Sequence, residues 1–214
     1  MSDAAVAADL ETYLSERVRS TPPSGIRRFF EIAATMDDVI SLGIGEPDFV
    51  TPQPALQAGI DALKNGATSY TANAGRADLR AAISEELSSR YGVSYSADDE
   101  ILSTVGVSEA MQLTMLSVLD PGDEILIPEP CFVSYAPTAR FADANVVHVP
   151  TSVENNFQVT AETLESHITP NTKALFLGYP NNPTGAVLRR DTLEAIATLV
   201  QEHDLLVISD EIYD

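Results

Sequence analysis

Residues 174–208 read ALFLGYPNNPTGAVLRRDTLEAIATLVQEHDLLVI, and this stretch contains the pattern that decides the fold class. Two short apolar runs, Ala174 to Leu177 and Leu205 to Ile208, predict strands. Residues 190–203 between them carry apolar side chains at helical spacing and predict a helix. A strand, a helix and a second strand in this order are typical of a parallel sheet.

The same alternation extends back to residue 101. We predict further strands at 101–105, 124–127 and 145–149 and further helices at 108–119, 133–141 and 161–167. Short apolar strands that alternate with helices indicate an α/β fold, with a mostly parallel sheet covered by helices on both faces. Closer to the N-terminus, the patterns predict helices at 8–19, 54–64 and 76–91 and a brief strand at 39–42.

The composition excludes several classes of partner. The 214 residues include 32 acidic and 12 basic side chains, which give a formal net charge of −20. Such a surface repels nucleic acid and anionic lipid, so we expect neither as a partner. Because only Lys64 and Lys173 are lysines, the acidic surface also suggests a halophile-like protein, since salt screens self-repulsion within about 3 Å at 1 M. An acidic protein of ordinary habitat is the alternative.

Cysteine content and hydropathy bear on the compartment. Cys131 is the single cysteine, so the chain has no disulfide framework. The N-terminus lacks a basic region followed by an apolar run, and no apolar stretch approaches the roughly 20 residues of a membrane span. We therefore expect a cytoplasmic protein without membrane contact.

The residues that follow the predicted strands are candidates for a binding site, because α/β sheets bind ligands beyond the carboxyl ends of their strands. Glycine, proline and polar residues follow four of these strands: Gly106-Val107-Ser108, Pro128-Glu129-Pro130, Gly178 to Gly185 and Ser209 to Tyr213. We therefore expect a site at this edge of the sheet.

The segment Gly106-Val107-Ser108 allows three interpretations. A helix N-terminus has unpaired N–H groups and the positive end of the helix dipole, which suit a phosphate. Ser108 could instead only cap its helix. The nucleophile elbow of α/β-hydrolases, Gly-x-Ser-x-Gly, is the third, although Ala110 replaces its last glycine and the three histidines have no distinctive setting.

Two further features are ambiguous when taken alone. Asp210 closes an apolar strand, and a buried carboxylate needs a donor or a cation, such as a protonated pyridine nitrogen. It could also be a simple cap. The segment Asn181 to Gly185 could be an ordinary turn, or its amide groups could donate to a ligand.

The order and spacing of these motifs resemble the class I/II aminotransferases, which are pyridoxal-phosphate-dependent enzymes of fold type I. The resemblance runs from about Ser24 to the last residue and includes the stretches SLGIGEPDFVTP, YTANAGRADLR, TVGVSEAMQ, PGDEILIPEPCFVSY, YPNNPTG and ISDEIYD. It implies that residues 1–50 contribute to a small domain and a substrate loop. Residues 51–214 would form part of the large cofactor-binding α/β domain, with a sheet that is incomplete at the C-terminus.

The resemblance implies roles around the ring of pyridoxal 5′-phosphate. Asp210 would pair with the pyridine nitrogen, and Asn182 and Tyr213 would donate hydrogen bonds to the phenolic oxygen. Phe132 would stack on the face of the ring. The family also implies a cis peptide bond between Asn182 and Pro183.

The remaining implied roles concern the phosphate, the substrate and the neighbouring subunit. Val107 and Ser108 would hold the phosphate, and Tyr70 would reach the phosphate of the other subunit in a homodimer. Gly45 and Asn182 would contact the substrate. No metal is implied.

The resemblance implies an enzyme of amino-acid metabolism and biosynthesis that passes an amino group from an amino acid to a 2-oxo acid. Neither Lys64 nor Lys173 matches the family's Schiff-base lysine, so we expect an N-terminal fragment that is inactive alone and contains no catalytic residue. Lyases and C–S lyases of the same fold type, and less readily an α/β-hydrolase using Ser108, are the alternatives. The donor stays open among aspartate, alanine and aromatic amino acids.

The charge of the chain predicts how salt affects cofactor binding. Because a chain of charge −20 repels an anionic phosphate, binding must depend on local donors, and salt weakens the long-range repulsion more than a short contact. We predict that the complete enzyme binds pyridoxal phosphate at least as tightly in molar salt as in dilute buffer, and loses dimer and cofactor together when salt is removed. Titration of cofactor absorbance against salt, with sedimentation in parallel, measures both. An affinity that falls steadily with added salt contradicts the prediction.

Overall fold

The computed structural model of the chain describes residues 12–23, 25–33, 35, 36, 38–40, 43, 45 and 47–213. Two compact units are formed, each described below by itself. One combines Met1–Pro23 with Val105–Asp214, and the other is Ser24–Thr104. This division differs from the boundary predicted at residue 50, which concerns the domains of the complete enzyme and stays a prediction.

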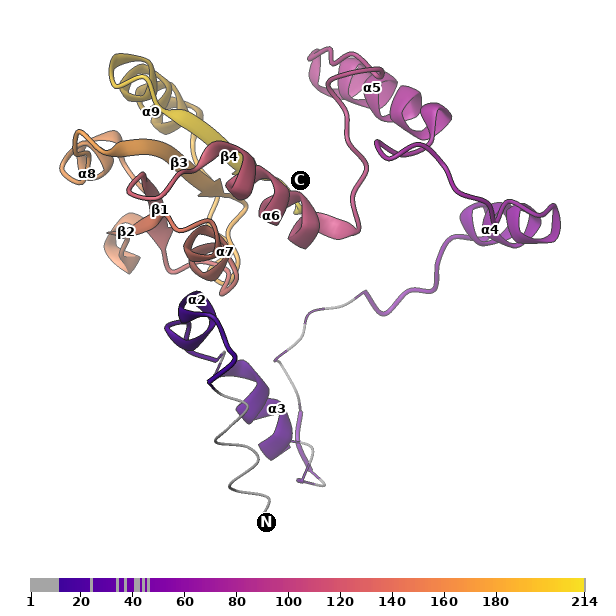
Figure 1. Ribbon diagram of the computed structural model, residues 1–214, viewed down its shortest axis with the longest axis horizontal. Coiled ribbons are helices and arrows are strands. Elements are labelled where there is room, and N and C mark those ends of the chain that lie inside the picture. The colour runs from indigo at the N-terminus through magenta and orange to yellow at the C-terminus, as the bar shows by residue number, and fades with distance from the viewer. Residues whose placement is uncertain are drawn as a thin grey trace. The chain divides into compact units, whose positions relative to one another are not determined.

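The first unit is built on a sheet of four parallel strands (Figure 1). The strands are β1 (Glu124–Glu129), β2 (Asn145–Pro150), β3 (Thr172–Gly178) and β4 (Leu206–Asp210), in the spatial order β2-β1-β3-β4. Every adjacent pair is parallel, so the predicted sheet type is confirmed. The register places Gly178 of β3 beside Asp210 of β4.

Helices cover both faces of this sheet, as predicted. Side chains alternate along a strand, so Ile125 and Ile127 face one core and Leu126 faces the other. The first core is closed by α6 (Gly106–Val118) and α7 (Tyr135–Phe141). The second is closed by α8 (Ala161–Glu165) and α9 (Arg190–Glu202). The α/β fold class is therefore confirmed.

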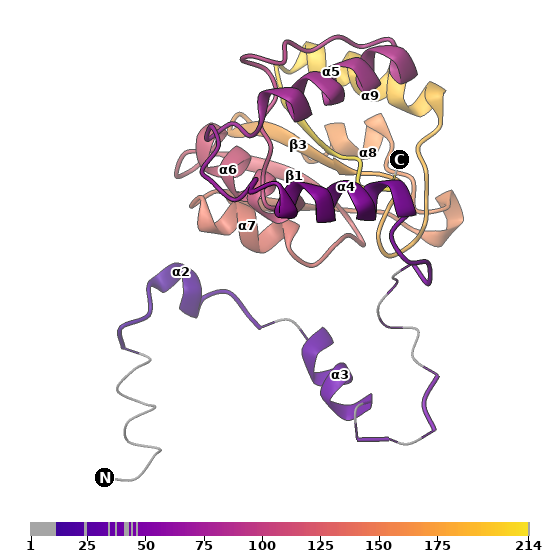
Figure 2. The same ribbon diagram turned by 90° about the vertical axis from the view of Figure 1, so that its right-hand side faces the viewer.

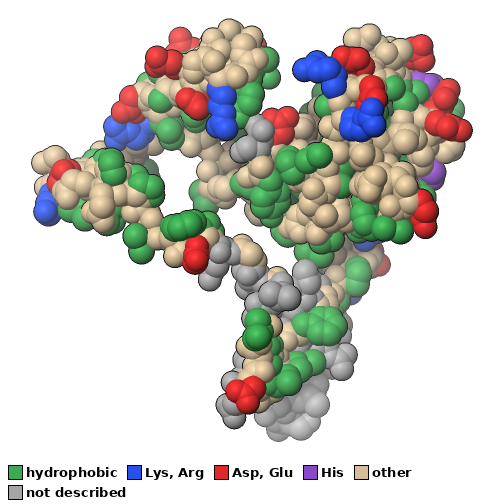
Figure 3. Space-filling model, turned by 180° about the vertical axis from the view of Figure 1, so that it is seen from behind, with side chains coloured by type: hydrophobic (Ala, Val, Ile, Leu, Met, Phe, Trp, Pro, Cys, Tyr) green, Lys and Arg blue, Asp and Glu red, His purple; other side chains and the backbone are tan. Residues whose placement is uncertain are grey.

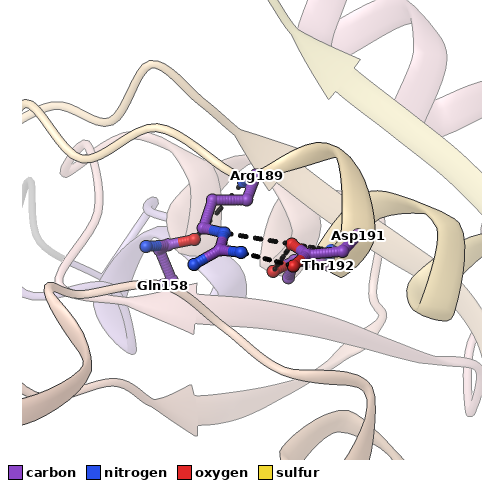
Figure 4. A network of polar contacts seen from close by, with 4 residues as sticks. All are labelled: Gln158, Arg189, Asp191 and Thr192. Atoms are coloured by element: carbon purple, nitrogen blue, oxygen red, sulfur yellow. Dashed lines mark hydrogen bonds and ion pairs between the residues drawn. The ribbon is translucent and has the colours of Figure 1, made fainter.

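The N-terminus of α9 is fixed by a network of polar contacts (Figure 4). Arg189 donates from Nε and Nη2 to the two carboxylate oxygens of Asp191, at 3.2 and 2.6 Å. The N–H of Thr192 donates to the same carboxylate, and the N–H of Arg189 donates to Oε1 of Gln158 at 3.3 Å. The network ties the helix to the segment before α8, and the Arg189 guanidinium lowers the pKa of Asp191.

Two short elements complete the first unit. The 3-10 helix η1 spans Val153–Asn155. The helix α2 (Glu16–Arg19) contacts the end of α7 through Arg17, which donates to the carbonyl oxygen of Phe141 at 3.0 Å and pairs with Asp143 at 3.1 Å. The predicted helix at 8–19 is thus shorter than expected in its described part, because residues 12–14 form a turn and bend; residues 8–11 lie outside the described residues.

The second unit contains α3 (Ile26–Ala33), α4 (Gln53–Lys64) and α5 (Ala77–Tyr91) (Figure 2). The buried Arg80 of α5 donates from Nη1 to the carbonyl oxygens of Ala97 and Asp98, which holds the following loop against the helix. The helices predicted at 54–64 and 76–91 are confirmed. The helix α3 was not predicted, since eight residues are too few for helical periodicity to stand out.

Two predicted strands need correction. Residues 101–104 have no regular structure, and neither have Val39 and Ile40; Ser41 and Leu42 lie outside the described residues. A strand requires a hydrogen-bonded neighbour along its length, and the described sheet contains only β1 to β4. The N–H of Ser103 bonds to the carbonyl oxygen of Ala74 at 3.0 Å, but residues 101–104 form no ladder with β1 to β4.

Both outer strands of the described sheet, β2 and β4, have a neighbour on one side only. The strand β4 pairs with β3 on one side only, and its Leu206 is 43% exposed, whereas the neighbouring positions of β3 are buried. Carboxylates are scattered over the visible surface of both units without forming a single patch (Figure 3). No helix in the described part of the chain combines the length and the apolar character that crossing a membrane requires.

The second core predicts the cost of truncating a central side chain. Leu126 is 0% exposed, and Leu126→Ala should lower the free energy of unfolding of the full-length gene product by about 2–5 kcal/mol. The control Leu63→Ala removes a side chain that is 67% exposed and should change it by less than about 0.5 kcal/mol. Urea denaturation followed by circular dichroism measures both, and equal effects would contradict the assigned core.

Candidate functional site

A cavity of about 220 Å³ lies at the carboxyl edge of the sheet in the first unit. It is lined by residues from the ends of β3 and β4, from α6 and from the segment around the start of α7: Val107, Ser108, Met111, Phe132, Tyr135, Asn182, Asp210, Ile212 and Tyr213. Every predicted cofactor residue except Tyr70 is in this set. The predicted convergence on one cavity is confirmed, whereas the roles of these residues stay predictions.

Asp210 is held by donors on both carboxylate oxygens. Its Oδ2 accepts a hydrogen bond from the hydroxyl of Tyr135 at 2.8 Å, and its Oδ1 accepts one from the N–H of Ile212 at 3.1 Å. These contacts fix the orientation of a half-buried carboxylate at the end of β4. A carboxylate aligned in this way can bind a cationic N–H group within the cavity.

Asn182 and Tyr213 form a polar pair in the lining. The Asn182 side-chain amide donates to the Tyr213 hydroxyl at 3.3 Å. The Asn182–Pro183 peptide bond is cis, as predicted. The pair presents an amide and a phenol, both of which can donate to an oxygen of a ligand.

The turn that carries Asn182 is anchored by its neighbour Asn181, which is buried. The Asn181 side-chain amide donates to the carbonyl oxygens of Pro130 and Gly178, at 3.2 and 3.3 Å. Its Oδ1 accepts from the N–H and the hydroxyl of Thr184, at 3.2 and 2.7 Å. Asn181 therefore joins the ends of β1 and β3.

The first turn of α6 supplies the remaining side of the cavity. Gly106 begins the helix with φ of +74°, a conformation that glycine adopts without strain. Val105 is the N-cap and makes no side-chain cap, and Ser108 lies inside the first turn. The alternative that Ser108 caps its helix is therefore wrong. Backbone N–H groups of a first helical turn suit a phosphate.

The hydrolase alternative lacks a base in this site. No histidine lines the described cavity. His148 pairs through Nδ1 with Glu129 at 2.6 Å, and Nδ1 of His167 lies 2.8 Å from the carbonyl oxygen of Thr163. His203 is the C-cap of α9. Ser108 is thus not part of a Ser–His arrangement.

Two residues with predicted roles belong to the other unit. Gly45 and the fully exposed Tyr70 lie within Ser24–Thr104. Their predicted roles, at the substrate and at the phosphate of a neighbouring subunit, stay predictions. The described residues contain no cluster of three or more His, Cys, Asp or Glu side chains arranged to hold a metal ion.

Three lining residues, Met111, Tyr135 and Ile212, and one anchor were not predicted. Tyr135 and Ile212 contact Asp210, and Asn181 anchors the turn. Ile212 contacts Asp210 through its backbone N–H, so the type of its side chain could not have predicted the contact. Tyr135 stands three residues after Phe132, a spacing that places both on one side of a helical turn, and this was the available clue.

Comparisons with known proteins establish the family. The sequence profile described as "Aminotransferase class I and II" matches residues 37–214. The chain belongs to this family. Its members depend on pyridoxal phosphate, so the fold type and the recognised resemblance are confirmed.

The relatives are similar over nearly the whole chain but are about twice as long. The chain is 47% identical over 204 residues to the putative aminotransferase YugH of Bacillus subtilis, covering 95% of this chain and 53% of that protein. It is 46% identical to the aspartate aminotransferase of Pyrococcus abyssi, covering 94% and 52%. A solved aspartate aminotransferase of Thermus thermophilus has a TM-score of 0.87 at 41% identity, covering 94% and 53%. The chain thus spans about half the length of these relatives.

The lining of the cavity fits pyridoxal phosphate on chemical grounds. The cofactor combines an aromatic ring, a ring nitrogen that can carry a proton, a phenolic oxygen and a phosphate. The cavity offers an aromatic face at Phe132, an oriented carboxylate at Asp210, two donors at Asn182 and Tyr213, and a helix N-terminus at Ser108. Each of these four groups of the cofactor therefore has a complementary group in the cavity.

Cys131 lies directly before Phe132 and provides a probe of this region. Burial raises the pKa of its thiol from 9.0 to about 11, with a smaller contribution from the charge of Glu129. A shift of this size lowers the thiolate fraction at pH 8 by about 100-fold. Alkylation of Cys131, followed by peptide mass spectrometry, should therefore rise with pH without levelling between pH 7 and 10. The urea-unfolded chain, whose thiol has the ordinary pKa of 9.0, should reach half its maximal rate near pH 9 and begin to level by about pH 10. Identical profiles would contradict the burial.

Proposed function

We propose that the complete protein is a pyridoxal-phosphate-dependent aminotransferase that transfers an amino group between an amino acid and a 2-oxo acid. The observation that carries the proposal is the meeting of the Asp210 carboxylate, the Asn182–Tyr213 pair and the first turn of α6 around one cavity, in a chain of the aminotransferase family.

Each group has a distinct task in this proposal. Asp210 binds the N–H of the pyridine ring and keeps the proton on that nitrogen. Asn182 and Tyr213 donate to the phenolic oxygen, and Phe132 packs on the face of the ring. The N–H groups of Val107 and Ser108, with the Ser108 hydroxyl, bind the phosphate. When bound, the cofactor supplies an electron sink for the bond-breaking at the substrate α-carbon.

The covalent attachment of the cofactor requires a lysine. Lys173 is engaged with Asp123 at 2.6 Å and Asp120 at 3.5 Å, and neither it nor Lys64 lines the cavity. We place the required lysine in the part of the relatives' length that this chain does not span. The same proposal includes a homodimer to which Tyr70 contributes, contact of Gly45 and Asn182 with the substrate, a cytoplasmic location and a role in amino-acid biosynthesis.

Asp210→Asn in the full-length gene product tests the proposal. Because removal of one partner of a buried charge pair costs about 3–5 kcal/mol, we expect kcat to fall at least about 100-fold. The control Glu211→Gln changes the adjacent, exposed carboxylate, which contacts Ser209, and should keep kcat within about twofold. Cofactor absorbance and amino-acid-dependent formation of a new amino acid from a 2-oxo acid are the measurements.

The outcomes separate the competing reactions. Release of ammonia or a thiol without need for a 2-oxo acid would favour a lyase of the same fold type. A wild-type protein that binds no pyridoxal phosphate, or an Asp210→Asn variant with unchanged activity, would remove the basis of the proposal.

A further inference from the structure

We infer that Tyr135 is a positioning residue for the Asp210 carboxylate, and that Gly178 is glycine because any larger residue would displace Tyr135. This inference rests on the proposed function, since it assigns Asp210 to the cofactor ring. It concerns two residues, at the start of α7 and at the end of β3, to which the sequence patterns gave no role.

The tyrosine ring is held in place by its surroundings. Tyr135 is 4% exposed, and its ring lies 4.2 Å from that of Phe176 and 5.7 Å from that of Phe132, measured between centroids. The second pair has an edge-to-face geometry, which is favourable for aromatic rings. The hydroxyl therefore has little freedom, and it donates to Oδ2 of Asp210 at 2.8 Å.

Gly178 provides the space that this contact requires. It pairs with Asp210 in the β3–β4 register, so the Tyr135 ring passes over Gly178 to reach the carboxylate. A Cβ atom at Gly178 would lie 2.7 Å from the Tyr135 hydroxyl oxygen and 2.9 Å from Cε2. Non-bonded carbon atoms pack at about 3.5–4.0 Å, so the ring would have to move.

In the hydrogen bond between Tyr135 and Asp210, the phenol is the donor and the carboxylate is the acceptor. Burial, followed by the hydrogen bond with Asp210, raises the pKa of Tyr135 well above its ordinary value, so the phenol stays a donor at physiological pH. The phenol donates to Oδ2 and the N–H of Ile212 donates to Oδ1, so the two donors together orient the carboxylate. A hydrogen bond to a charged acceptor is stronger than one between neutral groups, so its loss should be measurable at the cofactor.

Tyr135→Phe in the full-length gene product is the first test. The ring packing is kept and only the donor is lost. We expect about a 10-fold higher Kd for pyridoxal phosphate and about a 10-fold lower kcat, with KM for the amino acid within about twofold. The control Tyr179→Phe removes a hydroxyl that donates to the carbonyl oxygen of Phe157 at 2.9 Å and does not line the cavity; it should leave all three unchanged.

Gly178→Ala is the second test. It should raise the Kd for pyridoxal phosphate at least as much as Tyr135→Phe does, because the displaced ring no longer reaches Asp210. In the variant that combines Tyr135→Phe with Gly178→Ala, the Kd for pyridoxal phosphate should be no higher than in Gly178→Ala alone. Both changes remove the same hydrogen bond between Tyr135 and Asp210, so their effects should not add. The control Gly59→Ala places a methyl group on α4 where no atom outside the adjacent helix backbone lies within 4 Å, and should be neutral.

The results separate this inference from the proposed function. If the wild-type protein binds no pyridoxal phosphate and transfers no amino group, the proposed function fails and the inference fails with it. If the wild-type protein is active and Tyr135→Phe keeps Kd and kcat within about twofold, only the inference is overturned. A lower melting temperature with unchanged Kd and kcat also overturns it, because Tyr135 would then be purely structural.

Discussion

The carboxylate of Asp210 requires hydrogen-bond donors, and the surrounding elements are arranged to supply them. A charged group at the end of a partly buried strand is costly unless donors compensate for the lost water. The hydroxyl of Tyr135 and the N–H of Ile212 supply these donors. The tyrosine in turn requires the first core to hold its ring and requires the absence of a side chain at Gly178. One charge thus constrains α7, β3 and β4 together.

The parallel sheet is what brings distant residues to this charge. All four strands point the same way, so the segments that follow them meet at one edge. Ser108 and Asp210 are about a hundred residues apart in the chain, yet both line the same cavity. The two cores, one on each face, keep the strands in register, and the buried Asn181 joins the ends of β1 and β3.

Sequence patterns predicted the features that depend on local composition. The apolar runs of β1 to β4 predicted the strands, and the helical spacing of apolar residues predicted α9. The motifs around Ser108, Asn182 and Asp210 predicted residues that line the cavity. Features that depend on a distant neighbour were missed. Residues 101–104 have the composition of a strand but do not join the described sheet. The task of Tyr135 depends on a residue 75 positions away, which no local pattern reveals.

The contact between Tyr135 and Gly178 also restricts the routes by which this sequence can change over evolutionary time. Replacing the glycine codon with that of any other residue adds a Cβ atom at 2.7 Å from the phenol oxygen. Position 178 can therefore accept a side chain only after position 135 has become smaller. The reverse order passes through an intermediate sequence with a displaced ring. We therefore expect substitutions at these two positions to occur in a fixed order, with Tyr135 replaced first and Gly178 second.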